Sequence, residues 1–137
     1  KFDLVLGISD KKSKGIKKMC SKISNITCYD QTMNISQLMK KSDLSIGAGG
    51  STTWERCCLG LPSIVSIAAE NQKELTEAVA KNGCSINLGL VNETSSKDYQ
   101  KAINGIDSSS LTRMSQKCMQ LVDGNGVYRV TDVLLSM

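Results

Sequence analysis

Glycines and hydroxyl side chains are concentrated between residues 47 and 53, directly after a short apolar segment. Glycines let backbone N–H groups approach a ligand closely. A helix that begins behind such glycines presents free N–H groups and about half a positive charge to an anion. Gly49, Gly50, Ser51 and Thr52 are therefore predicted to bind a phosphate group through amides and hydroxyls, without a metal ion.

The same segment could instead be a tight turn between a strand and a helix, since such turns are common in parallel sheets. It is not a Walker A motif, because no Gly-Lys-Ser or Gly-Lys-Thr is present. Thr52 stands where the third glycine of the dinucleotide-binding motif would be. The spacing alone leaves a phosphate loop and a plain turn open.

Two further groups of polar side chains lie close to this loop in the predicted order of elements. Glu55 lies about one turn into the helix with its side chain directed back, so it can reach ribose hydroxyls or can complete a capping box with Ser51 or Thr52. Glu70, Asn71 and Gln72 follow a predicted strand, and the two amides suit sugar hydroxyl and acetamido groups. Asn71 could equally be a helix N-cap.

The elements that must position these residues alternate between strands and helices, which predicts an α/β fold with a Rossmann-like, doubly wound parallel sheet. Gly60 and Pro62 are expected to end the helix behind the glycine loop. The last two long helices are expected to begin after a cap at Ser95 or Ser96 and at Asp107 or Ser108. The predicted strands are Asp3–Leu6, Ile26–Tyr29, Asp43–Ile46, Ser63–Ala68 and Cys84–Leu88; the predicted helices are Lys14–Ile23, Ile35–Lys41, Thr53–Leu59, Asn71–Lys81, Ser96–Asn104, Ser108–Leu121 and Val127–Leu135.

The composition argues against a membrane-spanning protein and against a nucleic-acid-binding protein. A chain of 137 residues with 40% hydrophobic residues suits a single domain, 1–137. No apolar run reaches the roughly 18 residues of a membrane helix and no signal peptide is visible, so a cytoplasmic protein without a membrane span is expected. Five lysines lie between residues 11 and 18. They predict a solvated helix face, and the low aromatic content of 4% argues against nucleic acid binding.

The chain contains no histidine, and its six cysteines include no C-x-x-C pair. Zinc-site spacing is therefore absent, and no metal ion is expected. The thiols are interpreted as small buried hydrophobic groups in a reducing compartment.

The segment 47–72 resembles the carboxyl-terminal half of GT-B nucleotide-sugar enzymes of the MurG type. It is most similar to the UDP-diacetamido-trideoxy-altropyranose hydrolases of pseudaminic acid biosynthesis, whose module is also fused behind some acylneuraminate cytidylyltransferases. The resemblance extends over about residues 3–130, and its most specific parts are 49–55, 59–62 and 70–72.

The resemblance implies a UDP-sugar held in a cleft between two Rossmann-like domains, with no further cofactor. Glu55 then binds the ribose, and backbone groups near Thr32 and Met33 pair with uracil. Relative to these enzymes the chain lacks a first strand and the amino-terminal domain, whose histidine carries the catalysis. No catalytic residue is therefore expected in this chain, which reads as a piece of a longer two-domain protein.

The function implied is the UDP-sugar-binding half of a hydrolase in nonulosonic (pseudaminic or legionaminic type) acid and surface polysaccharide biosynthesis. Three alternatives stay open: the donor-binding domain of a GT-B glycosyltransferase, a non-catalytic module that holds a nucleotide sugar, and a Rossmann-like scaffold that binds only protein.

Overall fold

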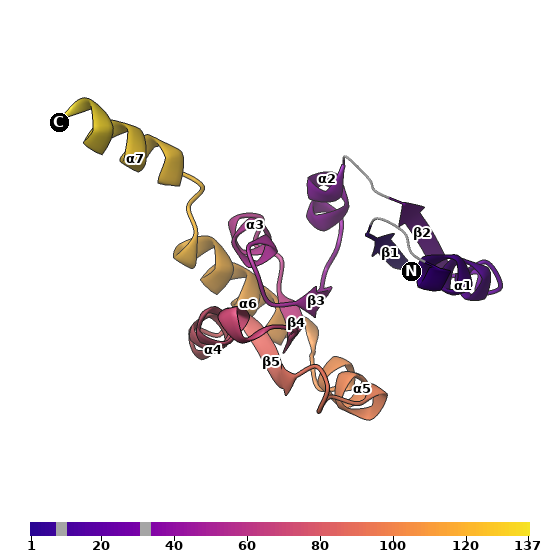
Figure 1. Ribbon diagram of the computed structural model, residues 1–137. Coiled ribbons are helices and arrows are strands. Elements are labelled where there is room, and N and C mark those ends of the chain that lie inside the picture. Colours follow the sequence, from indigo (N-terminus) through magenta and orange to yellow (C-terminus); the bar gives the residue numbers. More distant parts are fainter. Residues whose placement is uncertain (8–10, 31–33) are drawn as a thin grey trace. The chain divides into compact units, whose positions relative to one another are not determined.

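The computed structural model describes residues 1–7, 11–30 and 34–137. It contains two compact units, Lys1–Leu38 and Met39–Met137, each with a parallel sheet and accompanying helices (Figure 1). The predicted α/β class with parallel strands is confirmed. The strands form two sheets, of two and three strands, where one sheet was expected. A single domain for residues 1–137 stays a prediction.

The first unit is a β-α-β segment. Strands β1 (Phe2–Leu6) and β2 (Ile26–Asp30) pair in parallel from Phe2↔Ile26 onward, and helix α1 (Lys11–Cys20) packs on β2. The helix ends earlier than the predicted Ile23, because the N–H of Ile23 donates to the carbonyl of Cys20 in a turn. Helix α2 (Ile35–Lys40) follows. Thr32 and Met33, the predicted uracil-binding residues, lie outside the described residues.

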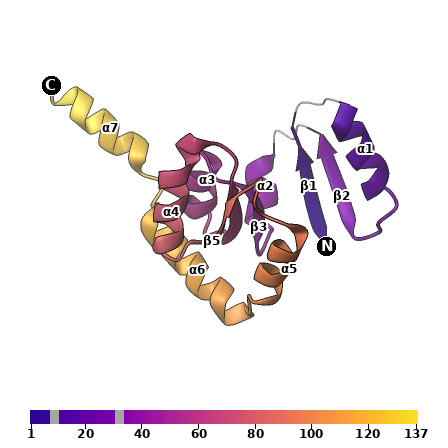
Figure 2. The same cartoon turned by 60° about the horizontal axis from the view of Figure 1, so that its bottom comes forward.

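The second unit is built on the parallel sheet β3-β4-β5, formed by Ser45–Ala48, Ser63–Ile67 and Ser85–Leu90. All five residues of the central strand β4 are buried. Helices α3 and α6 pack on each other, α4 packs on β4 and β5, and α5 contacts β5 (Figure 2). The helical elements are α3 (Thr52–Cys58), the 3₁₀ turn η1 (Glu70–Gln72), α4 (Lys73–Lys81), α5 (Ser96–Asn104), α6 (Ser108–Leu121) and α7 (Gly126–Leu135).

Strand β3 lies further along the chain than the prediction Asp43–Ile46 placed it. It pairs with β4 from Ser45↔Ser63 to Ala48↔Ser66, so Gly47 is inside the strand. The prediction followed the apolar side chains, whereas the position of the strand is determined by pairing with the buried strand β4. The glycine loop therefore begins only after Ala48.

Helix α3 ends where the sequence indicates. Leu59 is its C-cap, and Gly60 follows with a φ of +66°, a left-handed conformation that favours glycine. A Cβ at Gly60 would also lie 3.0 Å from Cγ of Met119 on α6. This glycine therefore both ends the helix and allows α6 to pack closely beside it.

The core between α3, α4 and α6 contains three thiols, Cys57, Cys84 and Cys118, together with Val79; Leu75 and Val122 pack against them. A hydrogen bond with Cys118 lowers the pKa of Cys57; burial opposes this shift, and the nearby positive charge of Arg56 adds to it. The six cysteines are free thiols, and Cys20, Cys57, Cys84 and Cys118 are buried as interpreted from the sequence. The interpretation as buried groups is wrong for Cys58, which is exposed, and for Cys28, which is only partly buried.

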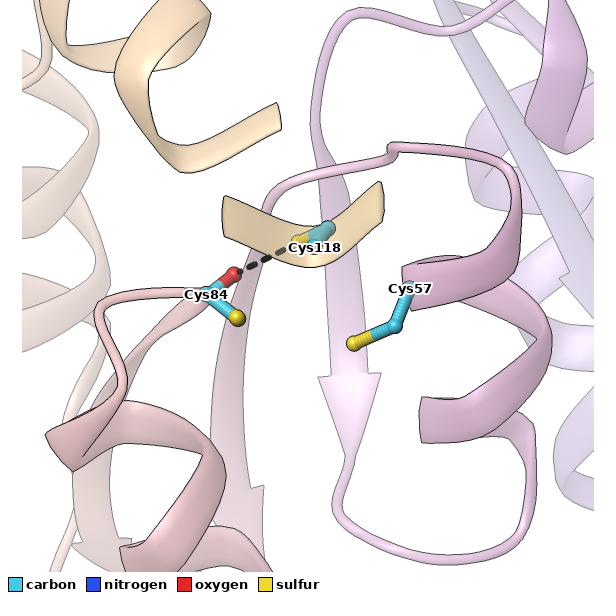
Figure 3. A group of neighbouring side chains, drawn as sticks. All are labelled: Cys57, Cys84 and Cys118. Carbon is cyan, nitrogen blue, oxygen red and sulfur yellow. Dashed lines mark hydrogen bonds between the residues drawn. The ribbon is translucent and has the colours of Figure 1, made fainter. Parts of the chain in front are cut away.

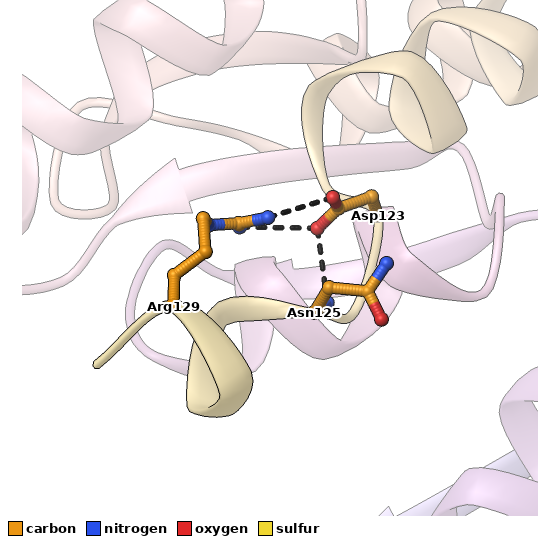
Figure 4. A network of polar contacts seen from close by, with 3 residues as sticks. All are labelled: Asp123, Asn125 and Arg129. Atoms are coloured by element: carbon orange, nitrogen blue, oxygen red, sulfur yellow. Dashed lines mark hydrogen bonds and ion pairs between the residues drawn. The ribbon is translucent and has the colours of Figure 1, made fainter. Parts of the chain in front are cut away.

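The connection between α6 and α7 is held by a local polar network. Arg129 forms an ion pair with Asp123 at 2.7 Å, and the N–H of Asn125 donates to the same carboxylate at 2.9 Å (Figure 4). These contacts keep the pKa of Asp123 below its usual value. Among the described residues, no helix is both long enough and apolar enough to span a membrane.

Candidate functional site

The glycine loop and the turn Glu70–Gln72 lie at the same edge of the β3-β4-β5 sheet. Because β3 and β4 are parallel and Ala48 pairs with Ser66, the loop after β3 and the turn after β4 leave the sheet side by side. A Cβ at Gly50 would lie 3.6 Å from Nε2 of Gln72. The structure thus brings Gln72 to the glycine loop, as expected for one binding site at the carboxyl ends of parallel strands.

The loop amides differ in what they offer to a ligand. The N–H of Gly49 donates to the carbonyl of Ser66 at 3.1 Å, and that of Gly50 donates to Oγ1 of Thr53 at 3.4 Å. The amides of Ser51 and Thr52 have no acceptor within the described part of the chain, and both residues are exposed. The prediction that the Gly49 amide is available to phosphate is therefore wrong, because this amide extends the β3–β4 pairing.

Gly49 serves instead as a point of close approach. A Cβ at this position would collide with Oγ1 of Thr76 and would lie 3.2 Å from its Cβ. Thr76 is 1% exposed, and its hydroxyl donates to the carbonyl of Gln72 at 2.6 Å. The absence of a side chain at Gly49 therefore lets α4 pack directly under the loop.

The start of α3 has no side-chain cap. Ser51 occupies the N-cap position with φ −56° and ψ −34°, and its hydroxyl makes no capping hydrogen bond. The capping box considered for Glu55 is therefore not formed, because Ser51 adopts helical rather than extended backbone angles. Glu55 is exposed in the first turn of α3. Its side chain is free of the capping role that competes with ribose binding.

Arg56 is a buried cation behind the loop, 3% exposed, that the sequence did not reveal. Its Nη2 donates to the carbonyl of Ala48 at 3.0 Å and to Oγ1 of Thr53 at 3.1 Å. It therefore ties the end of β3 to the first turn of α3. Burial lowers its pKa from the ordinary value, but an arginine stays charged in proteins. An arginine next to Glu55 on a helix reads as a surface residue, so no sequence signal marks it.

The three side chains of the turn Glu70–Gln72 differ in exposure and in hydrogen bonding. Glu70 and Asn71 are exposed. Oε1 of Gln72 accepts from the N–H of Ala68 at 3.0 Å, which leaves Nε2 near Gly50 for other partners. The alternative of Asn71 as an N-cap is wrong, because Gln72 occupies the N-cap position of α4 and Asn71 lies within the 3₁₀ turn.

Within the described residues, this edge offers two backbone amides without an acceptor, two hydroxyls, the side-chain amides of Asn71 and Gln72, and exposed carboxylates. Donors of this kind suit an anionic ligand that also carries hydroxyl groups. Arg56 adds a fixed positive charge behind the loop. Trp54 is 46% exposed and so lies outside the core of this unit.

Comparison with known proteins identifies the fold and the family. The glycosyltransferase family 28 C-terminal domain matches residues 3–130. The chain is 30% identical over 132 residues to the spore coat polysaccharide biosynthesis protein SpsG of Bacillus subtilis (strain 168), which covers 95% of this chain and 39% of that protein. The chain therefore spans about two fifths of the length of this relative.

Two solved structures share the fold. MurG of Acinetobacter baumannii superposes with a TM-score of 0.78 at 17% identity, over 98% of this chain and 43% of MurG. A glycotransferase of kitacinnamycin superposes with a TM-score of 0.69 at 14% identity, over 99% of this chain and 43% of that enzyme. At these identities the likeness shows the fold alone, a MurG-like GT-B carboxyl-terminal domain. With the family match over residues 3–130, the chain belongs to the glycosyltransferase family 28 C-terminal domain family.

Proposed function

We propose that this chain is the nucleotide-sugar-binding half of an enzyme of surface polysaccharide biosynthesis, and that it binds the UDP part of a UDP-sugar. One observation carries the proposal: the amides of Ser51 and Thr52, without acceptors in the described chain, lie at the same sheet edge as the Gln72 side chain. Relationship to a polysaccharide biosynthesis protein supports the wider context. A cytoplasmic location is part of the proposal.

Each part of a UDP-sugar is assigned to a group of residues in this proposal. The amides and hydroxyls of Ser51 and Thr52 bind the diphosphate. The amide of Gly50 joins them by giving up its long hydrogen bond of 3.4 Å to Oγ1 of Thr53. Glu55 accepts hydrogen bonds from the ribose diol. The role of Thr32 and Met33 in uracil binding rests on the sequence resemblance alone, since both lie outside the described residues. The sugar lies against Glu70, Asn71 and Nε2 of Gln72. Gly49 contributes by allowing close packing. No metal ion or cofactor takes part in this proposal.

The finer proposal is a UDP-sugar hydrolase of nonulosonic acid biosynthesis, which rests on the sequence resemblance of segments 49–55, 59–62 and 70–72. Water attacks the anomeric carbon, the bond from that carbon to the diphosphate oxygen breaks, and UDP leaves. The loop and the start of α3 stabilise the departing diphosphate. By the same resemblance, the general base that takes the proton of the attacking water is a histidine of the amino-terminal half of the enzyme; this chain has no histidine.

A glycosyltransferase is the second candidate, because the matched family and the MurG-like fold are those of glycosyltransferases. An acceptor hydroxyl then replaces water. The two candidates are distinguished by measuring UDP release from a UDP-sugar by this chain together with an amino-terminal half. A hydrolase releases UDP without an acceptor. A transferase releases UDP in proportion to the amount of acceptor sugar added.

The binding proposal is tested by Glu55→Gln, with Glu77→Gln on the exposed side of α4 as a matched control. Loss of a charged hydrogen bond to the ribose should weaken UDP binding by about 1–3 kcal/mol, measured by titration calorimetry. The control should bind as the wild type does, and addition of a magnesium chelator should change neither protein. Equal UDP affinity in a folded Glu55→Gln chain would remove Glu55 from the site.

A further inference from the structure

Three cysteines that are distant in the sequence converge in the core of the second unit. Cys57 comes from α3, Cys84 directly precedes β5 and Cys118 comes from α6 (Figure 3). Their sulfur atoms all lie within 4.8 Å of one another, and the residues are 2%, 1% and 0% exposed. The Sγ of Cys118 donates to the carbonyl of Cys84 at 3.5 Å. Three elements thus direct thiols toward one small region.

We propose that Cys57, Cys84 and Cys118 form a three-thiolate site for a soft d¹⁰ metal ion, Zn²⁺ or Cu⁺. Metal–sulfur bonds of about 2.3 Å around a central ion place three sulfurs about 4 Å apart. The sulfurs are already within 4.8 Å of one another, so small side-chain rotations bring them to that spacing. Thiolates select soft ions of this type over the hard ions Mg²⁺ and Ca²⁺.

The charge balance of the surroundings supports an anionic metal–thiolate centre. On binding, each thiol loses its proton to solvent and forms one metal–sulfur bond, so Zn²⁺ leaves a net charge of −1 and Cu⁺ a net charge of −2. Arg56, next to Cys57 on α3, is buried, and its hydrogen bonds to described residues go only to neutral acceptors. Its Nε has no hydrogen-bond partner in the described chain. Buried charges are usually paired, and an anionic centre beside Arg56 would provide the opposite charge.

Cys58, the neighbour of Cys57 in the sequence, provides a control that distinguishes metal binding at this site from the general reactivity of thiols. Cys58 is exposed, and its Sγ would lie 3.1 Å from a Cβ at Gly124, beyond the end of α6. Adjacent residues on a helix point about 100° apart, so Cys57 and Cys58 face different surroundings. Cys58→Ser is therefore a matched control for Cys57→Ser.

The bound ion would join α3, α6 and the start of β5. Because the three side chains are buried, the ion enters through local opening of the helices around the core. Binding to the native state then stabilises it, whereas binding to cysteines of the unfolded chain would destabilise it. The sign of the change in melting temperature distinguishes a native site from adventitious thiol chemistry.

The test uses the full 137-residue chain in a phosphine reductant, with Cd²⁺ as a spectroscopic probe. We expect a thiolate-to-cadmium charge-transfer band that saturates at one equivalent, a ¹¹³Cd chemical shift in the range of sulfur-rich sites, and a rise in melting temperature. Titration of Zn²⁺ and Cu⁺ into the cadmium complex should displace the band, and the ion that does so at lower concentration identifies the preferred occupant.

The variants decide the assignment. Cys58→Ser should keep the band and the rise in melting temperature, whereas Cys57→Ser should weaken binding by more than about tenfold, since loss of even an outer partner costs that much. If Cys57→Ser does not fold, the assignment is tested on the wild-type chain by NMR. The amide chemical shifts of Cys57, Cys84 and Cys118 should then change at lower cadmium concentrations than those of other residues. Absence of the band, a lower melting temperature with metal, or equal losses in both variants would overturn the proposal.

Discussion

Replacement of Gly49 by alanine should destabilise the second unit through one defined collision. The new Cβ would overlap Oγ1 of Thr76 and would lie 3.2 Å from its Cβ. Thr76 is buried and hydrogen-bonded to the carbonyl of Gln72, so it cannot move without losing that bond. Overpacking costs about 1–3 kcal/mol and the lost hydrogen bond about 1 kcal/mol. Alanine also lowers the conformational entropy of the unfolded chain, which offsets about 0.4–1 kcal/mol of this loss in stability. We expect a net loss of about 1–3 kcal/mol.

The assay is urea denaturation of Gly49→Ala, Thr76→Ala and the double variant, with Gly50→Ala as control. A Cβ at Gly50 meets its nearest atom at 3.6 Å, an ordinary contact, so this change should alter stability by less than about 1 kcal/mol. Removing the Thr76 hydroxyl relieves the collision, so the double variant should lose less than the sum of the single losses. A Gly49→Ala chain as stable as Gly50→Ala, or strictly additive losses, would refute this account of the loop.

Two further predictions concern single side chains. Arg56→Lys should lower the free energy of unfolding by about 1–3 kcal/mol in urea, because an ammonium group does not take the position of Nη2, which donates both to the carbonyl of Ala48 and to Oγ1 of Thr53. Arg113→Lys, at an exposed position on α6, should have little effect, and equal losses of stability in the two variants would contradict the role assigned to Arg56. Hydrogen bonds from Ser110 lower the pKa of Asp107 from 3.8 to about 2, so its charge stabilises the fold above pH 3.8 and this contribution is lost as pH falls through 2. Asp107→Asn should therefore melt below the wild type at neutral pH and approach it near pH 2; a gap that does not change with pH would exclude this charge effect.

Features that depend on a few neighbouring residues were predictable from the sequence. Helices α5 and α6 begin and end where predicted, because their caps are local. Ser95 and Asp98 form a capping box, and the Asp107 carboxylate accepts from the N–H of Ser110 at 2.7 Å. The glycine that ends α3 and the order of alternating strands and helices belong to the same class of local signal.

Features that depend on tertiary partners were not predictable. Strand β3 is positioned by pairing with β4, and as a result the Gly49 amide in the following loop already has an acceptor, the carbonyl of Ser66. Arg56 is buried only because α3 lies over the end of β3. The three core cysteines come from separate elements, so no spacing motif marks them. In each case the deciding contact joins residues that the sequence keeps apart.

The central claim is that the glycine loop and the turn Glu70–Gln72, at one edge of the β3-β4-β5 sheet, bind a nucleoside diphosphate. Its most direct test is a titration of the isotopically labelled chain with UDP, followed by amide chemical shifts with and without magnesium. We predict saturating shifts at Ser51, Thr52, Glu55 and Gln72 that do not require magnesium, and none on α6. Shifts elsewhere only, strict dependence on magnesium, or no shift at millimolar UDP would contradict the claim.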